Sequence, residues 1–410
     1  MRRLDTAPVC SAPPAARRGS RVRILDITKF YSAASGGVRT YLDSKIRAFQ
    51  ERGIDHALII PGERDEQTVE GGTRVYRLAG PVITFSPHYR LLVSARAIER
   101  VLRIEQPDVI EVGSPFLVPW LVARAMRRAP VPTVGFYHSD LVRTFAEPLV
   151  PERAMAGLRV ITRNAARSWV RTVYRRFDLT IAGSASVAAD LRSLGVTNVR
   201  CVPLGVDLNV FAPDAREPPR LREALGIDDH RPIALYVGRF CAEKRLDVVV
   251  EAVTRLPDAE RPHLLFVGGG PGKAWLEAMA AQLDHVSILP FVLDRLELAT
   301  MYRNADFYIA AGPGETFGLA IAEAMACGLP VVAVNRGAAP DRVAGCPASE
   351  LYRHGDAASC ARAIQRIARK LSPEIRSAAA RHSARVHSWD RTFDALIDLY
   401  EEVAGRGVRA

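Results

Sequence analysis

Several features are missing from this sequence, and each absence excludes a class of protein. No stretch approaches the roughly 20 consecutive apolar residues that a membrane-spanning helix needs, although the chain has 410 residues. The six cysteines are scattered and form no Cys-x-x-Cys pair. This spacing argues against a disulfide framework or a zinc site and is typical of reduced thiols in a cytoplasmic protein. The glycines also form no Gly-x-Gly-x-x-Gly dinucleotide fingerprint.

Positive charge is concentrated in the first half of the chain. Residues 1–200 hold 31 of the 56 lysines and arginines but only 18 of the 45 aspartates and glutamates. An uneven balance of this kind predicts an anionic partner, such as a membrane surface, a phosphorylated acceptor or a nucleic acid. The length suits two domains, and the proline-rich run at 213–219 marks a boundary between them.

Short apolar runs alternate with helical patterns in both halves. The first run, at 21–27, leads through a loop that contains Gly36 and Gly37 to a helix predicted at 40–52. Further strands are predicted at 56–60, 73–78, 109–112 and 132–136, and helices at 91–105 and 117–127. Repeated alternation predicts parallel sheets covered by helices. The paired glycines either leave backbone exposed to a ligand or form only a tight turn.

The most informative stretch reads as loop, helix, loop and strand over residues 312–334. Glu315 lies where the helix begins, and Glu323 lies about two turns further along. A helix start offers free backbone N–H groups and a positive dipole end, which suit a phosphate, while carboxylates can bind hydroxyl groups. These parts would hold a sugar nucleotide. In the alternative interpretation, Glu315 complements the helix dipole and Glu323 lies on a solvated face.

The two glutamates, followed by Ala-Met-Ala-x-Gly-x-Pro-Val-Val-Ala, resemble the donor-site signature of the family 4 retaining glycosyltransferases. The resemblance covers nearly the whole chain. It implies an α/β GT-B fold, in which two Rossmann-like domains face a central cleft and a C-terminal helix crosses back to the N-terminal domain. Residues 1–20 are rich in Ala, Pro and Arg without an apolar segment, which predicts a disordered tail. The resemblance places an acceptor-side domain at 21–208, a nucleotide-sugar-binding domain at 209–387, and the crossover helix and tail at 388–410.

The resemblance also implies roles for residues that match the family's motifs. Arg239 and Lys244 would grip the donor diphosphate, Glu315 the donor sugar and Glu323 the ribose hydroxyls. His138, at the end of the strand predicted at 132–136, would approach the sugar from its other side. The remaining donor-binding residues would be Gly36, Gly37, Gly238, Thr316, Phe317 and Gly318. The family's Gly-Gly-x-x-Glu loop is altered at 337–341, where Asp341 ends the motif.

A basic stripe is predicted on a helix that spans residues 158–177, a segment without any acidic residue. Apolar residues recur on another face of this helix and include Leu158, Ile161, Trp169, Val173 and Phe177. A basic amphipathic helix of this kind is typical of an interfacial membrane anchor. The alternative is a helix packed on the core with a solvated arginine face. The stripe consists of Arg159, Arg163, Arg167, Arg171 and Arg175.

These features predict an enzyme, a retaining hexosyltransferase that moves mannose or glucose from a UDP- or GDP-sugar to a membrane lipid or lipid-linked glycan. It would lie on the cytoplasmic side, peripheral to an anionic membrane, and would bind no nucleic acid. No cofactor is expected. No metal is expected either, because the chain contains no Asp-x-Asp sequence that could bridge a diphosphate through a metal.

Other functions remain open from the sequence. The acceptor could be soluble or a polysaccharide, and a GT-B sugar-nucleotide epimerase would need no acceptor at all. A nucleic-acid binder is disfavoured because no aromatic residues are interleaved on the basic face of the helix predicted at 158–177. An NAD-dependent oxidoreductase would need the missing glycine fingerprint, and a purely membrane-binding module would leave the donor motifs unexplained.

Overall fold

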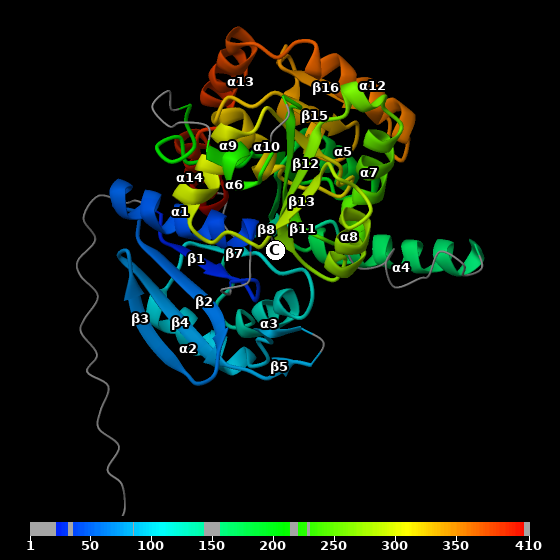
Figure 1. Ribbon diagram of the computed structural model, residues 1–410. Coiled ribbons are helices and arrows are strands. Elements are labelled where there is room, and N and C mark those ends of the chain that lie inside the picture. Colours follow the sequence, from blue (N-terminus) through cyan, green and yellow to red (C-terminus); the bar gives the residue numbers. More distant parts are fainter. Residues whose placement is uncertain are drawn as a thin grey trace, which may run out of the picture.

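Two parallel sheets, each covered by helices, form the two halves of the molecule (Figure 1). This computed structural model describes residues 22–31, 36–84, 86–142, 156–213, 220–227 and 230–405. The tail predicted at 1–20 and the last five residues of the chain lie outside these ranges. In the described part of the chain, no helix combines the length and the apolar character needed to cross a bilayer.

The first sheet has eight strands in the order β10-β9-β8-β7-β1-β2-β4-β3, and only the edge strand β3 runs antiparallel to its neighbour. Its helices are α1 (Gly37–Arg52), α2 (Ala95–Glu105), α3 (Val118–Ala125), α4 (Ala156–Tyr174) and α5 (Ala185–Ser193). Its strands are β1 (Ile24–Ile27), β2 (His56–Gly62), β3 (Glu66–Glu70), β4 (Thr73–Ala79), β7 (Val109–Val112), β8 (Thr133–Tyr137), β9 (Leu179–Ala182) and β10 (Val199–Cys201). A small hairpin, β5 (Val82–Ile83) and β6 (Ser86–Arg90), lies apart from this sheet.

The second sheet has six parallel strands in the order β13-β12-β11-β14-β15-β16. These strands are β11 (Ile233–Arg239), β12 (His263–Gly269), β13 (Val286–Leu289), β14 (Phe307–Ala310), β15 (Val331–Val334) and β16 (Ser349–Tyr352). The helices of this half are α6 (Arg220–Ala224), α7 (Leu246–Thr254), α8 (Lys273–Ala280), α9 (Arg295–Asn304), α10 (Leu319–Ala326), α11 (Ala339–Val343), α12 (Ala357–Ala368) and α13 (Pro373–Val386).

Each sheet is buried on both faces, which explains why its strands read as continuous apolar runs. In β1, Ile24 packs into the core under α1, whereas Leu25 packs into the core on the opposite face, under α2 to α5. The second sheet is covered in the same way, by α9, α10 and α13 on one face and by α7 and α12 on the other. The predicted α/β architecture is therefore confirmed.

The last helix, α14 (Trp389–Gly405), returns to the first half of the molecule, as predicted. Phe393 and Tyr400 are fully buried in the same core as α1, and Arg52 on α1 forms ion pairs with carboxylates of α14. Where the chain crosses, the Val206 N–H donates to the His387 carbonyl oxygen over 2.7 Å. The two connections between the halves therefore lie side by side.

Two predicted helices begin at other residues in the structure, and one further helix was not predicted. The first helix begins at Gly37 and not at 40, so this glycine forms the first turn and is not part of the loop. The helix predicted at 91–105 begins at Ala95, because the Ser94 side chain caps it by accepting a hydrogen bond from the Ala97 N–H. Helix α13 was not predicted, although Pro373 lies in its first turn, where the absence of an N–H costs nothing.

Candidate functional site

Two helix N-termini meet between the halves of the molecule. A Cβ atom on Gly37, the first residue of α1, would lie 3.1 Å from Cδ1 of Leu319, the first residue of α10. Neither helix has a side-chain cap, and neither carries an acidic residue in its first turn. Their free N–H groups and positive dipole ends therefore face a common region, which suits an anion such as a diphosphate.

The loop before α10 is held in a specific backbone conformation. Gly318 has φ +63°, in the left-handed region that favours glycine, and directly precedes the helix. The buried Arg342 of α11 donates from Nε to the Phe317 carbonyl oxygen over 2.5 Å. The Ala338 N–H donates to the Glu315 carbonyl oxygen over 2.8 Å. These bonds fix the backbone N–H groups at the start of α10.

Lys244 and Glu315 form an ion pair beside this helix start. Lys244 ends a short 3₁₀ turn after β11, and its side chain crosses to the loop that carries Glu315. Burial lowers the pKa of Lys244, but the Glu315 carboxylate outweighs this effect and raises the pKa above its ordinary value. Lys244 therefore stays protonated, as a group that stabilises a phosphate must.

Arg239 lies at the carboxyl end of β11, close to Lys244 in sequence but more exposed. Its Nη2 donates to the Glu243 carboxylate over 2.8 Å. Glycines occupy the strand ends beside Arg239. Gly238 of β11 pairs with Gly268 of β12, and both have φ near +150°. A Cβ atom on Gly268 would lie 1.9 Å from the Gly238 carbonyl oxygen, so no side chain fits there, at the edge where parallel sheets bind nucleotides.

Glu323 is buried in α10 and has two partners. Its Oε1 lies 3.0 Å from Arg295 Nη2, and its Oε2 accepts a hydrogen bond from the Tyr302 hydroxyl over 3.2 Å. Burial raises the pKa of Glu323 despite these partners. Glu323 therefore does not lie on a solvated face, which excludes that alternative for this residue.

His138 follows β8 on the opposite side of the cleft and is buried. Its ring stacks on Phe136 with centroids 4.3 Å apart, and its Nδ1 has no hydrogen-bond partner among the described residues. Burial, with a smaller effect from Lys45, lowers the pKa of His138 to about 3. The imidazole is therefore neutral at physiological pH, and its Nδ1 atom is buried.

The side chains of Thr316 and Phe317 reach across to the first half of the molecule. The Thr316 hydroxyl donates to the His138 carbonyl oxygen over 2.8 Å, and the Phe317 ring meets the His138 ring edge-on with centroids 5.6 Å apart. A Cβ atom on Gly183 would lie only 2.1 Å from the Phe317 ring. These contacts join the two halves of the molecule through the loop that precedes α10.

Two family models match most of the chain. Residues 231–370 match the model described as glycosyl transferases group 1, and residues 35–210 match the model described as glycosyltransferase family 4. A protein of Mycobacterium tuberculosis strain H37Ra is 31% identical over 386 residues, which is 92% of this chain and 95% of that protein. It is named GDP-mannose-dependent alpha-(1-6)-phosphatidylinositol dimannoside mannosyltransferase.

The chain is a family 4 glycosyltransferase. A second relative supports the same assignment. It comes from M. tuberculosis strain CDC 1551, is named GDP-mannose-dependent alpha-mannosyltransferase, and is 30% identical over 394 residues, which cover 94% of this chain and 98% of the relative. The predicted family and the prediction of a nucleotide-sugar-dependent enzyme are therefore confirmed.

Solved structures of glycosyltransferases share the fold of this one. Sucrose-phosphate synthase from Thermosynechococcus elongatus superposes with a TM-score of 0.77 over 94% of this chain and all of that chain, at 21% identity. WaaG, a glycosyltransferase of lipopolysaccharide biosynthesis, superposes with a TM-score of 0.67 over 92% of this chain and 99% of that chain, at 15% identity. At such identities the likeness concerns the fold alone, and it confirms the GT-B prediction.

In this glycosyltransferase, the two ends of the basic helix α4 differ in burial. Val173, near the end of α4, and Phe177, which follows the helix, are buried in the first domain's core. Leu158 and Ile161 are exposed, the latter to 66%, so the apolar stripe is not a continuous core face. Figure 1 shows α4 projecting from the body of the enzyme.

The arginines that the structure describes on α4 face solvent, whereas Trp169 is anchored. Arg163, Arg167 and Arg171 are exposed, and the side chain of Arg159 lies outside the described residues. Trp169 is 40% exposed and donates from Nε1 to the Pro115 carbonyl oxygen over 3.0 Å.

The altered loop at 337–341 connects the domains. Asp341 Oδ2 accepts a hydrogen bond from the Ser186 N–H over 2.8 Å, near the start of α5 in the first domain. This carboxylate is therefore engaged away from the donor region. In the described part of the chain, no group of three or more His, Cys, Asp or Glu residues is arranged to hold a metal ion.

Sequence reasoning missed two residues that support the site. Arg295 opens α9 and pairs with Glu323, and Arg342 fixes the Phe317 carbonyl although burial lowers its pKa to about 10. Both arginines lie in segments that read as ordinary charged helix turns, so only the tertiary contacts reveal them.

Proposed function

We propose that the enzyme transfers mannose from GDP-mannose, with retention of anomeric configuration, to a lipid or lipid-linked acceptor. One observation carries this proposal. The uncapped N-termini of α1 and α10 converge beside the Lys244–Glu315 pair, and the loop before α10 contacts the neutral His138. This arrangement suits a diphosphate with a sugar attached.

The chemistry follows from the charges around the leaving group. Transfer leaves a nucleoside diphosphate, whose developing negative charge must be stabilised in the transition state. The Lys244 ammonium, the exposed Arg239 and the N–H groups at the start of α10 would supply this stabilisation. Glu315 would accept hydrogen bonds from the mannose hydroxyls, and Gly36 and Gly37 would let backbone approach the phosphates.

Glu323 would hold the ribose of the nucleotide. Its present partner Arg295 is partly exposed, so a ribose diol could share the carboxylate with this arginine. Gly238 and Gly318 would keep the donor side free of side chains. The Nδ1 atom of His138 would bond to a hydroxyl of the transferred sugar.

The names of the relatives support the donor and the acceptor. Both M. tuberculosis relatives are named as GDP-mannose-dependent, and one name includes a phosphatidylinositol acceptor. Among the solved structures, an Anabaena protein similar in fold was crystallised with UDP and glucose. Because the relatives similar in sequence are named for GDP-mannose, whereas the UDP-bound protein is similar in fold alone, a mannosyl donor is favoured over glucose from a UDP-sugar.

A donor panel tests the proposal. Purified enzyme is incubated with labelled GDP-mannose, UDP-glucose and other UDP- or GDP-sugars, together with membrane lipid extract. The expected result is a labelled lipid from GDP-mannose alone, whose linkage NMR shows to be α. Free mannose without lipid product would support a hydrolase instead, and an epimer of mannose would support an epimerase. Labelled mannose in a soluble glycan would show that the acceptor is a soluble glycan and not a lipid.

We also propose that the projecting end of α4 attaches the enzyme to an anionic membrane. Exposed apolar residues, Leu158, Val160 and Ile161, lie on the same helix as the exposed arginines. Apolar insertion together with basic contacts is how an interfacial helix binds a leaflet, and each arginine contributes on the order of 1 kcal/mol. Attachment at the cytoplasmic face stays a prediction.

Sedimentation with phosphatidylglycerol vesicles tests this attachment. Ile161→Asp is expected to reduce vesicle binding about tenfold, because it places a carboxylate where the apolar side chain would insert. The matched control is Val69→Asp, which alters a valine that is 67% exposed on β3. Equal loss in both variants would contradict a specific role of α4.

A further inference from the structure

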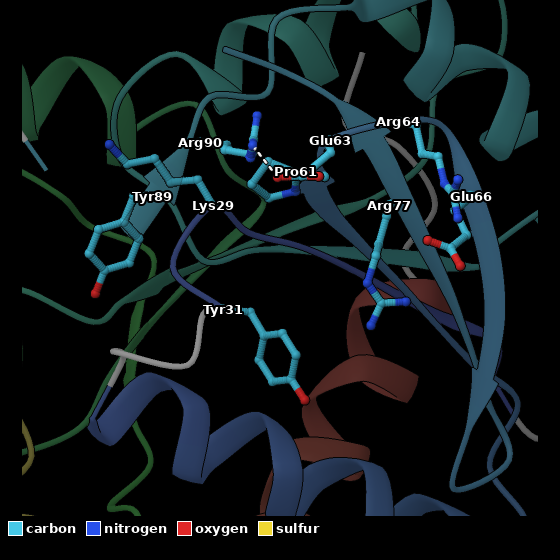
Figure 2. Close-up of a pocket in the computed structure, with 10 residues that line it drawn as sticks. Lys29, Tyr31, Pro61, Glu63, Arg64, Glu66, Arg77, Tyr89 and Arg90 are labelled. Carbon is cyan, nitrogen blue, oxygen red and sulfur yellow. Dashed lines mark hydrogen bonds and ion pairs between the residues drawn. The ribbon is translucent and has the colours of Figure 1, made fainter. Parts of the chain in front are cut away.

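A cavity of about 550 Å³ opens in the first domain, apart from the donor residues. Figure 2 shows Tyr31 and Arg77 extending toward its hollow from opposite sides, with Arg90 bound to Glu63 above them. Four cationic side chains but only two carboxylates line it. The side chains that define the cavity are those of Lys29, Tyr31, Glu63, Arg77, Tyr89 and Arg90.

The cavity lies along the edge of the sheet that faces the cleft. Lys29 follows β1 by two residues, Gly62 ends β2, and Arg77 lies near the end of β4. These parallel strands end on the same side as β8, which His138 follows. Two strand intervals separate β1 from β8 in the sheet order, which corresponds to about 10 Å. The cavity therefore opens at the same edge of the sheet as His138.

Lys29 is a cation without a matching anion in the described part of the chain. Its Nζ lies over the rings of Phe116 and Phe30, 4.2 and 5.0 Å from their centroids. Burial lowers the pKa of Lys29. Aromatic faces stabilise an ammonium only in part, so the site favours a ligand that brings negative charge.

The other cations are oriented by the sheet and the hairpin. Arg77 donates to the Glu70 carboxylate over 2.5 Å and to the Thr68 hydroxyl over 2.7 Å. Arg90 donates to Glu63 over 2.6 Å and to the Gly80 carbonyl oxygen over 3.1 Å. Guanidinium groups held in this way match the oxygens of a phosphate. The Tyr31 hydroxyl, which donates to Asp43 over 2.7 Å, and the exposed Glu63 can accept hydrogen bonds from a polyol.

We propose that this cavity binds the phosphate of an acceptor, with Lys29 and Arg77 as its cationic contacts and an adjoining polyol directed toward His138. The assignment rests on the proposed transferase function, because it names the chemical class of that enzyme's acceptor. The phosphate can belong to a phospholipid headgroup or to a free polyol phosphate, since both offer the same group to the cavity.

Calorimetry tests the site without any transfer reaction. Inositol 1-phosphate and unphosphorylated inositol are titrated into the full-length enzyme and its variants. We expect the phosphate probe to bind more tightly than inositol, and Lys29→Gln to weaken it about tenfold or more, as for loss of one charged contact. Lys29→Arg, which keeps the charge, is expected to retain most of the affinity. Arg103→Gln, at an exposed arginine on α2, is the control.

Transfer assays then separate this inference from the proposed function. Acceptors are inositol 1-phosphate, phosphatidylinositol vesicles and the neutral octyl mannoside. For Lys29→Gln we expect KM to rise about tenfold for phosphate-bearing acceptors and to stay unchanged for the neutral one. If the KM of Lys29→Gln rises only for phosphatidylinositol vesicles, the phosphate belongs to a lipid headgroup. If it rises only for inositol 1-phosphate, the phosphate belongs to a free polyol phosphate.

Three results would overturn the assignment. The first is equal binding of inositol and its phosphate by the wild-type enzyme, and the second is unchanged affinity in Lys29→Gln. The third is an equal loss of transfer to neutral and phosphate acceptors, which would make Lys29 a general structural residue. If the phosphate probe binds as expected but no acceptor is labelled, the proposed transfer reaction is wrong and the binding site stands.

Discussion

Helices α1 and α10 meet at the cleft through their N-termini, and each buries one charged side chain further along. On α1, Lys45 is completely inaccessible, with its Nζ 2.8 Å from Asp26 Oδ1, 3.3 Å from Glu111 Oε2 and 2.8 Å from the Tyr400 hydroxyl. On α10, the carboxylate of Glu323 pairs with Arg295, which is partly exposed.

Lys45 and Glu323 differ in the solvent exposure of their partners. Helix α14 covers Lys45, so all of its partners are internal and no ligand can replace them. The partner of Glu323 reaches solvent, so a ligand hydroxyl can join this pair. A buried charge is therefore structural where the chain surrounds it, and available for binding where one partner stays open. Four predictions test this comparison.

The largest effect is expected for Lys45→Met. This change leaves Asp26 and Glu111 buried without their cation, and loss of one partner of a buried ion pair costs about 3–5 kcal/mol. Urea unfolding should show this loss in the free energy of unfolding. The KM for the donor should stay near the wild-type value in the folded fraction, and a selective rise in that KM would contradict a purely structural role.

Lys244→Ala should reduce kcat about 10²–10³-fold, because it removes one preorganised charge from the leaving group. Stability should change little, since the side chain lies at the cleft. Arg255→Ala is the control, because it removes an exposed arginine paired with Glu251 on α7. Equal rates for Lys244→Ala and the wild-type enzyme would show that the donor diphosphate lies elsewhere.

The pH dependence of stability isolates Glu111. Burial raises the pKa of Glu111 from 4.5 to about 7, although Lys45 opposes the shift. Between pH 4.5 and 7, folded Glu111 keeps a proton that the unfolded state has already released. The stabilisation that this proton gives is therefore complete below pH 4.5 and is lost as the pH rises to 7. Relative to Glu111→Gln, the wild-type protein should lose about 3 kcal/mol of unfolding free energy between pH 4.5 and 8. A constant difference would refute the raised pKa.

Glu323→Ala should raise the KM for the donor about 10–100-fold, since a buried carboxylate would no longer hold the ribose. The kcat at saturating donor should fall less, because the reacting bond lies further along the donor. Glu251→Ala, at the exposed partner of Arg255, provides the carboxylate control. If kcat fell and the KM stayed constant, Glu323 would act on the transition state and not on the nucleotide.

The sequence revealed much of the donor side. Residues 312–334 form a continuous loop, helix and strand, and the short 3₁₀ turn that carries Lys244 follows its strand directly. Local signals therefore sufficed, because glycines, helix spacing and charges within a few residues of one another define these elements. The roles of the individual residues stay predictions, as do the domain boundaries at 208 and 387.

The acceptor side depends on residues far apart in sequence. Lys29 and Arg77 come from different strand ends of one sheet, and the strand order that places them at one cavity follows no local pattern. Lys45 reads as an ordinary surface lysine on an amphipathic helix until α14 covers it.

The sequence by itself therefore determined the alternation of strands and helices, the family and the donor motifs, since periodicity and turn chemistry act over short distances. Only the tertiary structure decided which charges are enclosed, how Phe317 closes the cleft against Gly183, and where the first domain is hollow. Burial and side-chain contact depend on the packing of distant segments, which no local pattern encodes.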